Sequence, residues 1–306
     1  MRLGFVFPGQ GSQYVGMGSE VNRVFYEAAQ IIGDAESCLG YDISELCFFG
    51  PQEKLDQTEY AQPAILLTSV VLFELLKKFD VEPVVVAGLS LGEYTALVAS
   101  GAMTLQEALP LVQRRGQIMQ EAVPAGQGGM YVVLGLDGSM VDQICREDGG
   151  QVSVANYNAP GQVVVAGAAE DLKRVTATLK KAGARVSKVA MSVPSHSPLL
   201  KTAAEKLRPE LEKVKWQKPA IPVLSNVTGD YYGDSDPVDL LVKQLYSPVL
   251  WEQCVRRMMD QVDYFVEIGP GKTLSGLIKR IARKQMLMNI DGVNSLKELS
   301  EKVEED

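Results

Sequence analysis

The sequence predicts an α/β protein in which a large domain with a parallel central sheet is interrupted by a smaller α+β domain. Residues 84–87, VVVA, form the kind of continuous β-branched run that is typical of a fully buried parallel strand. From about Met130 the pattern changes to short strands and helices that follow one another closely. A chain of 306 residues is also near the upper limit for one hydrophobic core. We therefore expect the large domain at residues 1–126 and 192–306, and the inserted domain at residues 127–191.

The first predicted element of the large domain is a short apolar strand at Leu3–Phe7, which must end at Pro8 and Gly9. The GQGSQ that follows is predicted to be a tight turn that exposes its backbone. Residues 62–79, QPAILLTSVVLFELLKKF, hold apolar residues too densely for a single stripe, which predicts a helix buried on most sides. The VVVA strand is followed by GLSLG and by a helical stretch, EYTALVAS, that closes at Gly101.

The inserted domain is predicted from six segments within residues 130–191: MYVVLGL, SMVDQICRE, QVSVANYN, QVVVAGA, EDLKRVTATLKKAG and RVSKVAM. Their periodicities predict strand, helix, strand, strand, helix and strand in that order. This order is the split βαβ, ferredoxin-like arrangement, which closes on its own.

The large domain is expected to resume near Val193. A strand is predicted at IPVLSN (221–226) and an amphipathic stretch around Gln244–Met259. A further strand at YFVEIG (264–269) runs into the turn GPGKT. The Lys/Glu-rich tail after Ser295 is predicted to be a solvated terminal helix.

Composition excludes several classes of protein. A hydrophobic content of 46% with 22% charged residues fits an ordinary water-soluble globule. The formal net charge of −8 disfavours nucleic acid or an anionic membrane as the main partner. The longest apolar run, Ile65–Leu76, contains Glu74 and is shorter than the roughly 20 residues of a membrane span. The amino terminus has no secretory pattern, so a cytoplasmic protein is expected.

The cysteines and the histidine offer little for a metal site. The four cysteines are far apart in the sequence and include no Cys-x-x-Cys pair: Cys38, Cys47, Cys145 and Cys254. The chain has one histidine. We therefore expect neither a metal nor a disulfide framework.

The most informative motif is GLSLGEY at residues 88–94. A Gly-x-Ser-x-Gly pentad between a strand and a helix places its serine on a sharp turn, with the hydroxyl exposed, as in α/β-hydrolase-like domains. Ser90 is therefore a candidate nucleophile, and the amide of Leu91, at a helix amino terminus, a candidate oxyanion donor. The alternative is a plain Gly/Ser turn that caps a helix.

A serine nucleophile needs a base, and near neutral pH that base is usually histidine. His196, in VPSHSPLL, is the only histidine of the chain and lies on a turn between Pro194 and Pro198. We take His196 as the candidate base. The alternative is an ordinary surface or core histidine.

Two further motifs leave alternatives open. The FPGQGSQ turn either is a simple β-turn or supplies a second oxyanion donor through the amide of Gln10. In QRRG (113–116), neighbouring arginines on a helix point about 100° apart, so at most one faces a cleft. The pair is either solvated or provides a bidentate clamp for a substrate carboxylate.

These motifs together resemble one family. FPGQGSQ, GLSLGEY, QRRGQIMQEAVPAG, NYNAPGQVVVAG, VPSHSPLL, NVTG, QLYSPVLW and EIGPGKTL occur in an order that resembles the malonyl-CoA:acyl carrier protein transacylases, from about residue 3 to about residue 295. The related acyltransferase domains of polyketide synthases share most of these motifs. VPSHS resembles the stand-alone enzymes more closely.

The resemblance implies a role for individual residues. Ser90 matches the acyl-accepting serine and His196 its general base, while Gln10 and Leu91 match the oxyanion-hole amides. Arg115 matches the arginine that binds the malonyl carboxylate. Gln244, in QLYSPVLW, matches the residue whose main-chain carbonyl orients the histidine, in place of a triad aspartate.

One position departs from the family pattern: GHSLG is the common form, and this chain has Leu89 before the serine. We expect the chemistry to survive, because that residue is not the base. Any hydrogen bond that the histidine makes beside the nucleophile is lost.

The implied substrates are malonyl-CoA and an acyl carrier protein, with CoA as a substrate and no tightly bound cofactor or metal. The carrier is expected to be acidic, so a local basic patch must receive it; Arg114, Lys188 and the run KRIARK (279–284) are the candidates. A monomer is expected, since the chain has no coiled-coil heptads. An esterase or thioesterase, and a non-catalytic carrier-binding protein, are the alternatives, and fatty-acid and polyketide synthesis both stay open as pathways.

Overall fold

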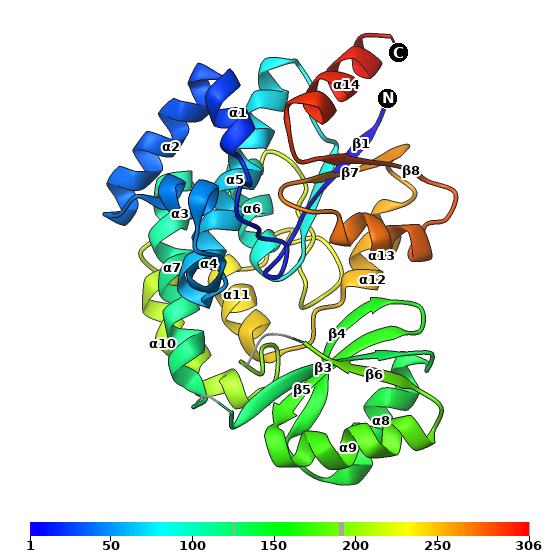
Figure 1. The fold of residues 1–306 in the computed structure, drawn as a ribbon. Coiled ribbons are helices and arrows are strands. Elements are labelled where there is room, and N and C mark those ends of the chain that lie inside the picture. Colours follow the sequence, from blue (N-terminus) through cyan, green and yellow to red (C-terminus); the bar gives the residue numbers. More distant parts are fainter. Residues whose placement is uncertain (125, 190–192, 306) are drawn as a thin grey trace.

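The computed structural model describes residues 1–124, 126–189 and 193–305, which form two four-stranded sheets with helices around them (Figure 1). The larger part contains a parallel sheet of strand order β2-β1-β7-β8. Its strands are β1 (Leu3–Phe7), β2 (Val85–Gly88), β7 (Tyr264–Ile268) and β8 (Met286–Ile290). The predicted strands at residues 3–7, 84–87 and 264–269 are confirmed. Strand β8 was not predicted, because MLMNI is a half-buried edge with no alternation.

Helices cover both faces of this parallel sheet. Those of the larger part are α1 (Ser19–Val24), α2 (Tyr26–Leu39), α3 (Ile43–Phe49), α4 (Gln52–Leu55), α5 (Thr58–Lys78), α6 (Leu91–Ala99), α7 (Leu105–Ala122), α10 (Lys201–Leu211), α11 (Pro237–Tyr246), α12 (Trp251–Met258), α13 (Thr273–Ile281) and α14 (Val293–Glu304), with a short 3-10 turn at Pro198–Leu200. In β1, Phe5 and Phe7 both meet Phe73 of α5 edge to face. Val6, between them, packs into the core formed by α12 and α13. Burial on both faces is why β1 and β2 are apolar throughout.

Helix α5 is the central helix of the larger part. By length and composition it could cross a membrane, but 83% of its most apolar window is buried inside the protein. Phe73 and its neighbours pack against the sheet on one side and other helices on the other. The prediction of a helix buried on most sides is confirmed, and the burial identifies α5 as a core helix.

The second sheet is antiparallel and lies at the end of the molecule away from both termini (Figure 1). Its order is β4-β5-β3-β6, built from β3 (Gly128–Leu134), α8 (Gly138–Asp148), β4 (Val152–Ala159), β5 (Gln162–Ala168), α9 (Ala169–Lys181) and β6 (Arg185–Lys188). Val133 and Val165 pack against α8 and α9, whereas Met130 and Val164 lie on the opposite face. The predicted element order is therefore confirmed. The predicted end of this insertion, residue 191, lies outside the described residues.

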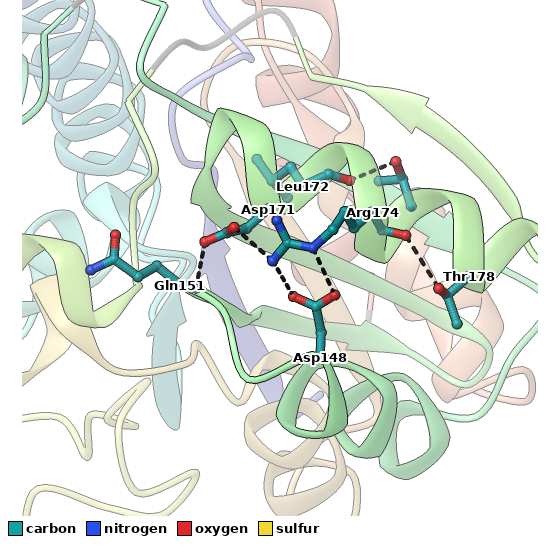
Figure 2. Close-up of polar contacts among 7 residues, drawn as sticks. Asp148, Gln151, Asp171, Leu172, Arg174 and Thr178 are labelled. Carbon is teal, nitrogen blue, oxygen red and sulfur yellow. Dashed lines mark hydrogen bonds and ion pairs between the residues drawn. The ribbon is translucent and has the colours of Figure 1, made fainter.

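An exposed ion network ties the helices of this smaller part together (Figure 2). Arg174 of α9 pairs with Asp148 at the end of α8 at 2.9 Å and with Asp171 at 2.7 Å. Asp171 also accepts a hydrogen bond from the backbone N–H of Gln151 at 2.8 Å. The network therefore connects α8, α9 and the residue that precedes β4.

The larger part contacts the smaller sheet where the segment before α12 pairs with β4. The Val249 N–H donates to the carbonyl of Ala155 at 2.8 Å, and the Tyr157 N–H donates to the carbonyl of Val249 at 2.9 Å. These two hydrogen bonds attach β4 of the smaller sheet to the larger part.

Three predictions for the carboxyl-terminal half need correction. IPVLSN forms only isolated bridges, of Val223 with Val86 and of Leu224 with Tyr231, because Pro222 has no N–H to donate to a ladder. The amphipathic stretch is two helices, α11 and α12, separated around Pro248. The terminal helix exists as α14, but it buries Leu296 and Leu299 and is solvated on one face only.

Candidate active site

Ser90 lies on a sharp turn between β2 and α6. Its backbone φ is 54°, a left-handed value that is uncommon outside glycine. The turn needs glycine on both sides: a Cβ on Gly88 would lie 1.8 Å from the carbonyl carbon of Gly92, and one on Gly92 would lie 2.0 Å from the carbonyl oxygen of Phe7. The Ser90 N–H donates to the side-chain oxygen of Asn226 at 2.7 Å. The pentad is therefore a tight strand-to-helix turn with the serine at its apex.

His196 faces Ser90 from a second strained turn, with a φ of 58°. The Ser90 Oγ lies 2.7 Å from His196 Nε2, and His196 Nδ1 lies 2.7 Å from the backbone carbonyl oxygen of Gln244. A carbonyl can only accept, so Nδ1 carries the proton and Nε2 is left with the lone pair toward Ser90. This tautomer suits a base that removes the serine proton.

The surroundings of His196 keep its ring neutral. The side chain is buried, which together with the positive charge of Arg115 lowers the pKa of His196 to about 4, against a smaller opposing effect of the Gln244 carbonyl. At neutral pH the imidazole therefore holds no extra proton and can accept one.

Arg115 is buried beside the same hydroxyl. Its Nη2 donates to Ser90 Oγ at 3.2 Å and to Gln244 Oε1 at 3.0 Å, and its Nη1 donates to Gln62 Oε1 at 2.9 Å. Burial lowers the pKa of Arg115 from its usual value, although arginine stays charged at neutral pH. The neighbouring Arg114 has a side chain that is 43% exposed, so only one arginine of the QRRG pair faces the site.

Two backbone amides near Ser90 are free to bind a ligand. Within the described part of the chain, neither the Leu91 N–H nor the Gln10 N–H has a hydrogen-bond acceptor. Leu91 offers only its backbone, because its side chain is fully buried in the core. The side chain of Gln10 is bonded to Thr58 at 3.1 Å, which anchors the 9–12 turn to α5.

A cavity of about 290 Å³ opens beside Ser90. The 9–12 turn, Ser90, Arg115 and His196 line it from the larger part, and Met130, Asn156 and Val164 line it from the smaller sheet. Its walls are mostly apolar with a few polar groups, as in a small-molecule site. In the described residues, no three His, Cys, Asp or Glu side chains gather as a metal site would require.

Comparisons with known proteins show which family the chain belongs to. The family model of the acyl transferase domain matches residues 4–297. The malonyl CoA-acyl carrier protein transacylase of Haemophilus influenzae is 43% identical over 98% of this chain and 98% of its own length. The chain belongs to the malonyl-CoA:acyl carrier protein transacylase family.

Solved structures of the transacylase family share the whole fold. A crystal structure of the Clostridium perfringens enzyme is similar with a TM-score of 0.96 at 41% identity, covering 100% of this chain and 98% of that one. A malonyl-transacylase in complex with a type II PKS acyl-carrier protein is similar with a TM-score of 0.94 at 40% identity, covering 99% and 100% of the two chains.

Sequence reasoning missed a polar group that lies beneath the transacylase site. Glu93 and Asn226 are fully buried, and burial raises the pKa of the Glu93 carboxyl to about 7 against the effect of its hydrogen bonds. Gln62, also fully buried, holds Arg115. A signal for Glu93 was present, since it is a charged residue in the otherwise apolar first turns of α6. Two of its partners, Asn226 and Gln244, lie in the NVTG and QLYSPVLW motifs, but nothing in these motifs indicated a contact with Glu93.

Proposed function

We propose that this protein transfers a malonyl group from malonyl-CoA to the phosphopantetheine thiol of an acyl carrier protein, through a malonyl ester on Ser90. The observation that carries the proposal is the meeting of Ser90 Oγ with His196 Nε2 at 2.7 Å and with Arg115 Nη2 at 3.2 Å. The base and a cation that can bind a carboxylate thus both contact the oxygen of the nucleophile. The names of the relatives support the same transfer, and one similar structure holds an acyl-carrier protein.

In the first half-reaction His196 removes the proton of Ser90 while the serine oxygen attacks the thioester carbonyl. The amides of Leu91 and Gln10 stabilise the tetrahedral oxyanion, and removal of one such donor typically costs about 3 to 4 kcal/mol. The carbon–sulfur bond then breaks, and the CoA sulfur leaves with the proton from His196. The Gln244 carbonyl, 2.7 Å from Nδ1, holds the ring in the productive tautomer throughout.

In the second half-reaction the thiol of the carrier protein takes the place of CoA. His196 removes the thiol proton, the sulfur attacks the malonyl ester, and the proton passes to the Ser90 oxygen as the ester bond breaks. Donor and acceptor therefore use one site in turn, which is a ping-pong transfer.

Arg115 gives the proposed site its preference for a dicarboxylic acyl group. Its guanidinium is buried and can pair with the free malonyl carboxylate, which acetyl-CoA lacks. The contact of its Nη2 with Ser90 Oγ at 3.2 Å supports this role, because the acyl group would be carried on that oxygen.

The same proposal includes the types of the two domains, the location and oligomeric state of the protein, and its partners. We infer an α/β-hydrolase-like larger domain and a ferredoxin-like inserted domain at residues 127–191, supported by the parallel order β2-β1-β7-β8 and the antiparallel order β4-β5-β3-β6. We also propose a cytoplasmic monomer that needs no metal or bound cofactor and has neither nucleic acid nor membrane as a partner. The net charge of −8 supports the last point.

The experiment is to incubate the protein with malonyl-CoA, measure its intact mass and map the modified peptide, with acetyl-CoA and Ser90→Ala in parallel. A single malonyl adduct on the peptide that contains GLSLGEY, absent in Ser90→Ala and discharged by a carrier protein, is expected. Steady CoA release without an adduct would favour a hydrolase, and the absence of both would end the catalytic proposal.

A further inference from the structure

Glu93 occupies an unusual place for a carboxylate. It stands three residues after Ser90 in the first turn of α6 and is fully buried. Its two oxygens accept hydrogen bonds from the Tyr232 hydroxyl at 2.5 Å, the Gln244 Nε2 at 2.7 Å and the Asn226 backbone N–H at 3.1 Å. Since burying a carboxylate is costly without such partners, the position calls for an explanation.

Two of the partners of Glu93 hold the turn that carries the nucleophile. The side chain of Asn226 accepts from the Ser90 N–H at 2.7 Å and donates to the Gly88 carbonyl at 2.7 Å. The side chain of Gln244 donates to the Ser90 carbonyl at 3.0 Å. The backbone on both sides of Ser90 is therefore fixed by two residues that are bonded to Glu93, Asn226 through its backbone N–H and Gln244 through its side chain.

Gln244 also connects Glu93 to the base and to the cation. Its backbone carbonyl accepts from His196 Nδ1, and its side-chain oxygen accepts from Arg115. Its amide orientation follows from the network, because the NH₂ group faces two acceptors and the oxygen faces a donor. Glu93 supplies one of those two acceptors.

We propose that Glu93 is a positioning residue of the acyl transfer. By binding Asn226 and Gln244, it fixes the positions of Ser90 and His196 relative to each other. This role rests on the proposed function. Glu93 itself touches neither the acyl group nor the reacting atoms.

Glu267 provides a matched comparison within the same chain. It is also a buried glutamate, but it accepts from the backbone N–H groups of Leu274 at 2.9 Å and Ser275 at 2.7 Å and so caps α13. Within the described part of the chain, neither of these partners is bonded to Ser90 or His196. Shortening Glu267 should therefore affect stability without affecting the register of the reacting groups.

The test compares Glu93→Asp, Glu93→Gln and Glu267→Asp. Aspartate keeps the carboxyl group of Glu93 but is one methylene shorter, so it cannot reach both Asn226 and Gln244. We expect kcat for malonyl transfer to fall roughly 10- to 100-fold with little change in KM. Glutamine keeps an acceptor oxygen for Asn226 and Gln244, so kcat should stay within about fivefold of wild type. Glu267→Asp should lower Tm and leave kcat unchanged.

A second readout does not depend on activity. His196 is the only histidine, so its ring gives a single set of nitrogen signals in an NMR spectrum. Glu93→Asp should move these signals toward a mixture of tautomers, whereas Glu93→Gln and Glu267→Asp should leave them unchanged. Failure of the proposed function would instead appear in wild type, as the absence of a malonyl adduct on Ser90.

Several results would overturn the positioning role. One is a Glu93→Asp variant with wild-type kcat and unchanged ring signals. Another is a Glu93→Gln variant that loses as much activity as Glu93→Asp, or shows altered ring signals. A third is a Glu267→Asp variant that reproduces the effects of Glu93→Asp on the ring, since the effect would then follow general destabilisation.

Discussion

Two polar networks, one beneath Ser90 and one around Arg174, use similar chemical groups and differ in their contact with water. Beneath Ser90, Glu93, Asn226 and Gln244 are fully buried, and both Asn226 and Gln244 are bonded to Glu93. On helices α8 and α9 of the smaller part, Arg174 is 54% exposed while it pairs with Asp148 and Asp171 (Figure 2). A group that loses its partner at the surface binds water instead, whereas a buried group cannot. The buried network should therefore respond to single substitutions as a unit, and the exposed network should not.

The largest expected effect is on the base at the edge of the buried network. His196→Ala removes the group that takes the proton of Ser90, so formation of the malonyl enzyme should slow by about 10²- to 10⁴-fold. Single-turnover mass measurements with malonyl-CoA would give the rate. A loss of less than tenfold, in a variant with the wild-type Tm, would remove His196 from the mechanism.

Arg115 tests whether the buried network also selects the substrate. Arg115→Ala removes the cation that can pair with the malonyl carboxylate, so kcat/KM for malonyl-CoA should fall roughly 10- to 100-fold. Transfer of acetyl should fall much less. Arg114→Ala is the matched control for formation of the acyl enzyme, a step that needs no carrier protein: its side chain is exposed, so this step should keep the wild-type rate with both donors. Equal losses of malonyl and acetyl transfer in Arg115→Ala would refute the selective role.

Asn226 tests the structural side of the same network. Asn226→Ala leaves the Ser90 N–H and the Gly88 carbonyl without their partner, at a cost of about 1 to 3 kcal/mol in the free energy of unfolding. Urea denaturation of wild type and variant would measure this difference. An unchanged denaturation midpoint would show that the turn does not depend on its buried partner.

The buried network should also make stability depend on pH through His196. Its pKa is lowered from 6.5 to about 4 by burial and by Arg115, so between these values the unfolded chain holds a proton that the folded chain lacks. The contribution of His196 to stability is thus fully present above pH 6.5 and is lost as the pH falls toward 4. Relative to His196→Gln, wild type should lose Tm as the pH falls through this window.

His196→Gln is the reference because Glu93 also makes stability depend on pH. The pKa of Glu93 is raised to about 7, so in the folded state it holds a proton that the unfolded state releases above about pH 4.5, and stability falls as the pH rises toward 7. This trend opposes that of His196. Both proteins contain Glu93, so its contribution cancels in the difference, and a Tm difference that stays constant from pH 7 to 4 would contradict the lowered pKa of His196.

The smallest effect is expected in the exposed network. Arg174→Ala breaks the ion pairs with Asp148 and Asp171, yet Tm should stay within about 2 °C of wild type, because both carboxylates can bind water. Malonyl transfer should not change. A loss of stability as large as that of Asn226→Ala would remove the distinction between the two networks.

The elements that the sequence predicted are those with a strong local pattern. The VVVA run and the pentad after it located β2 and the Ser90 turn, and the single histidine left His196 as the one candidate partner. Strand β8 was missed because half-burial at an edge leaves no clear periodicity. IPVLSN had the composition of a strand, but Pro222 and the turn at Asn226 allow only isolated bridges.

The motifs marked Arg115 and Gln244 as site residues, but they did not predict the hydrogen bonds of the buried network. Glu93 lies 133 residues before Asn226 and 151 before Gln244, and a hydrogen bond over such a separation leaves no periodic trace in the sequence. Gln62 and Arg115 likewise meet from two different helices. A sequence pattern indicates that a residue is buried, while the fold alone determines which polar groups become its partners.

The left-handed backbone of Ser90 and His196 means that the fold forgoes some stability at its reacting residues. Among the described residues, Asp80 is the only other non-glycine residue with a positive φ. Glycine adopts this conformation without the steric cost that a Cβ brings, so from backbone conformation alone either position would suit glycine better. Glycine has no hydroxyl and no imidazole, however. Selection for stability alone would therefore favour an inactive protein, and the two residues mark where this chain retains strain for the sake of its chemistry.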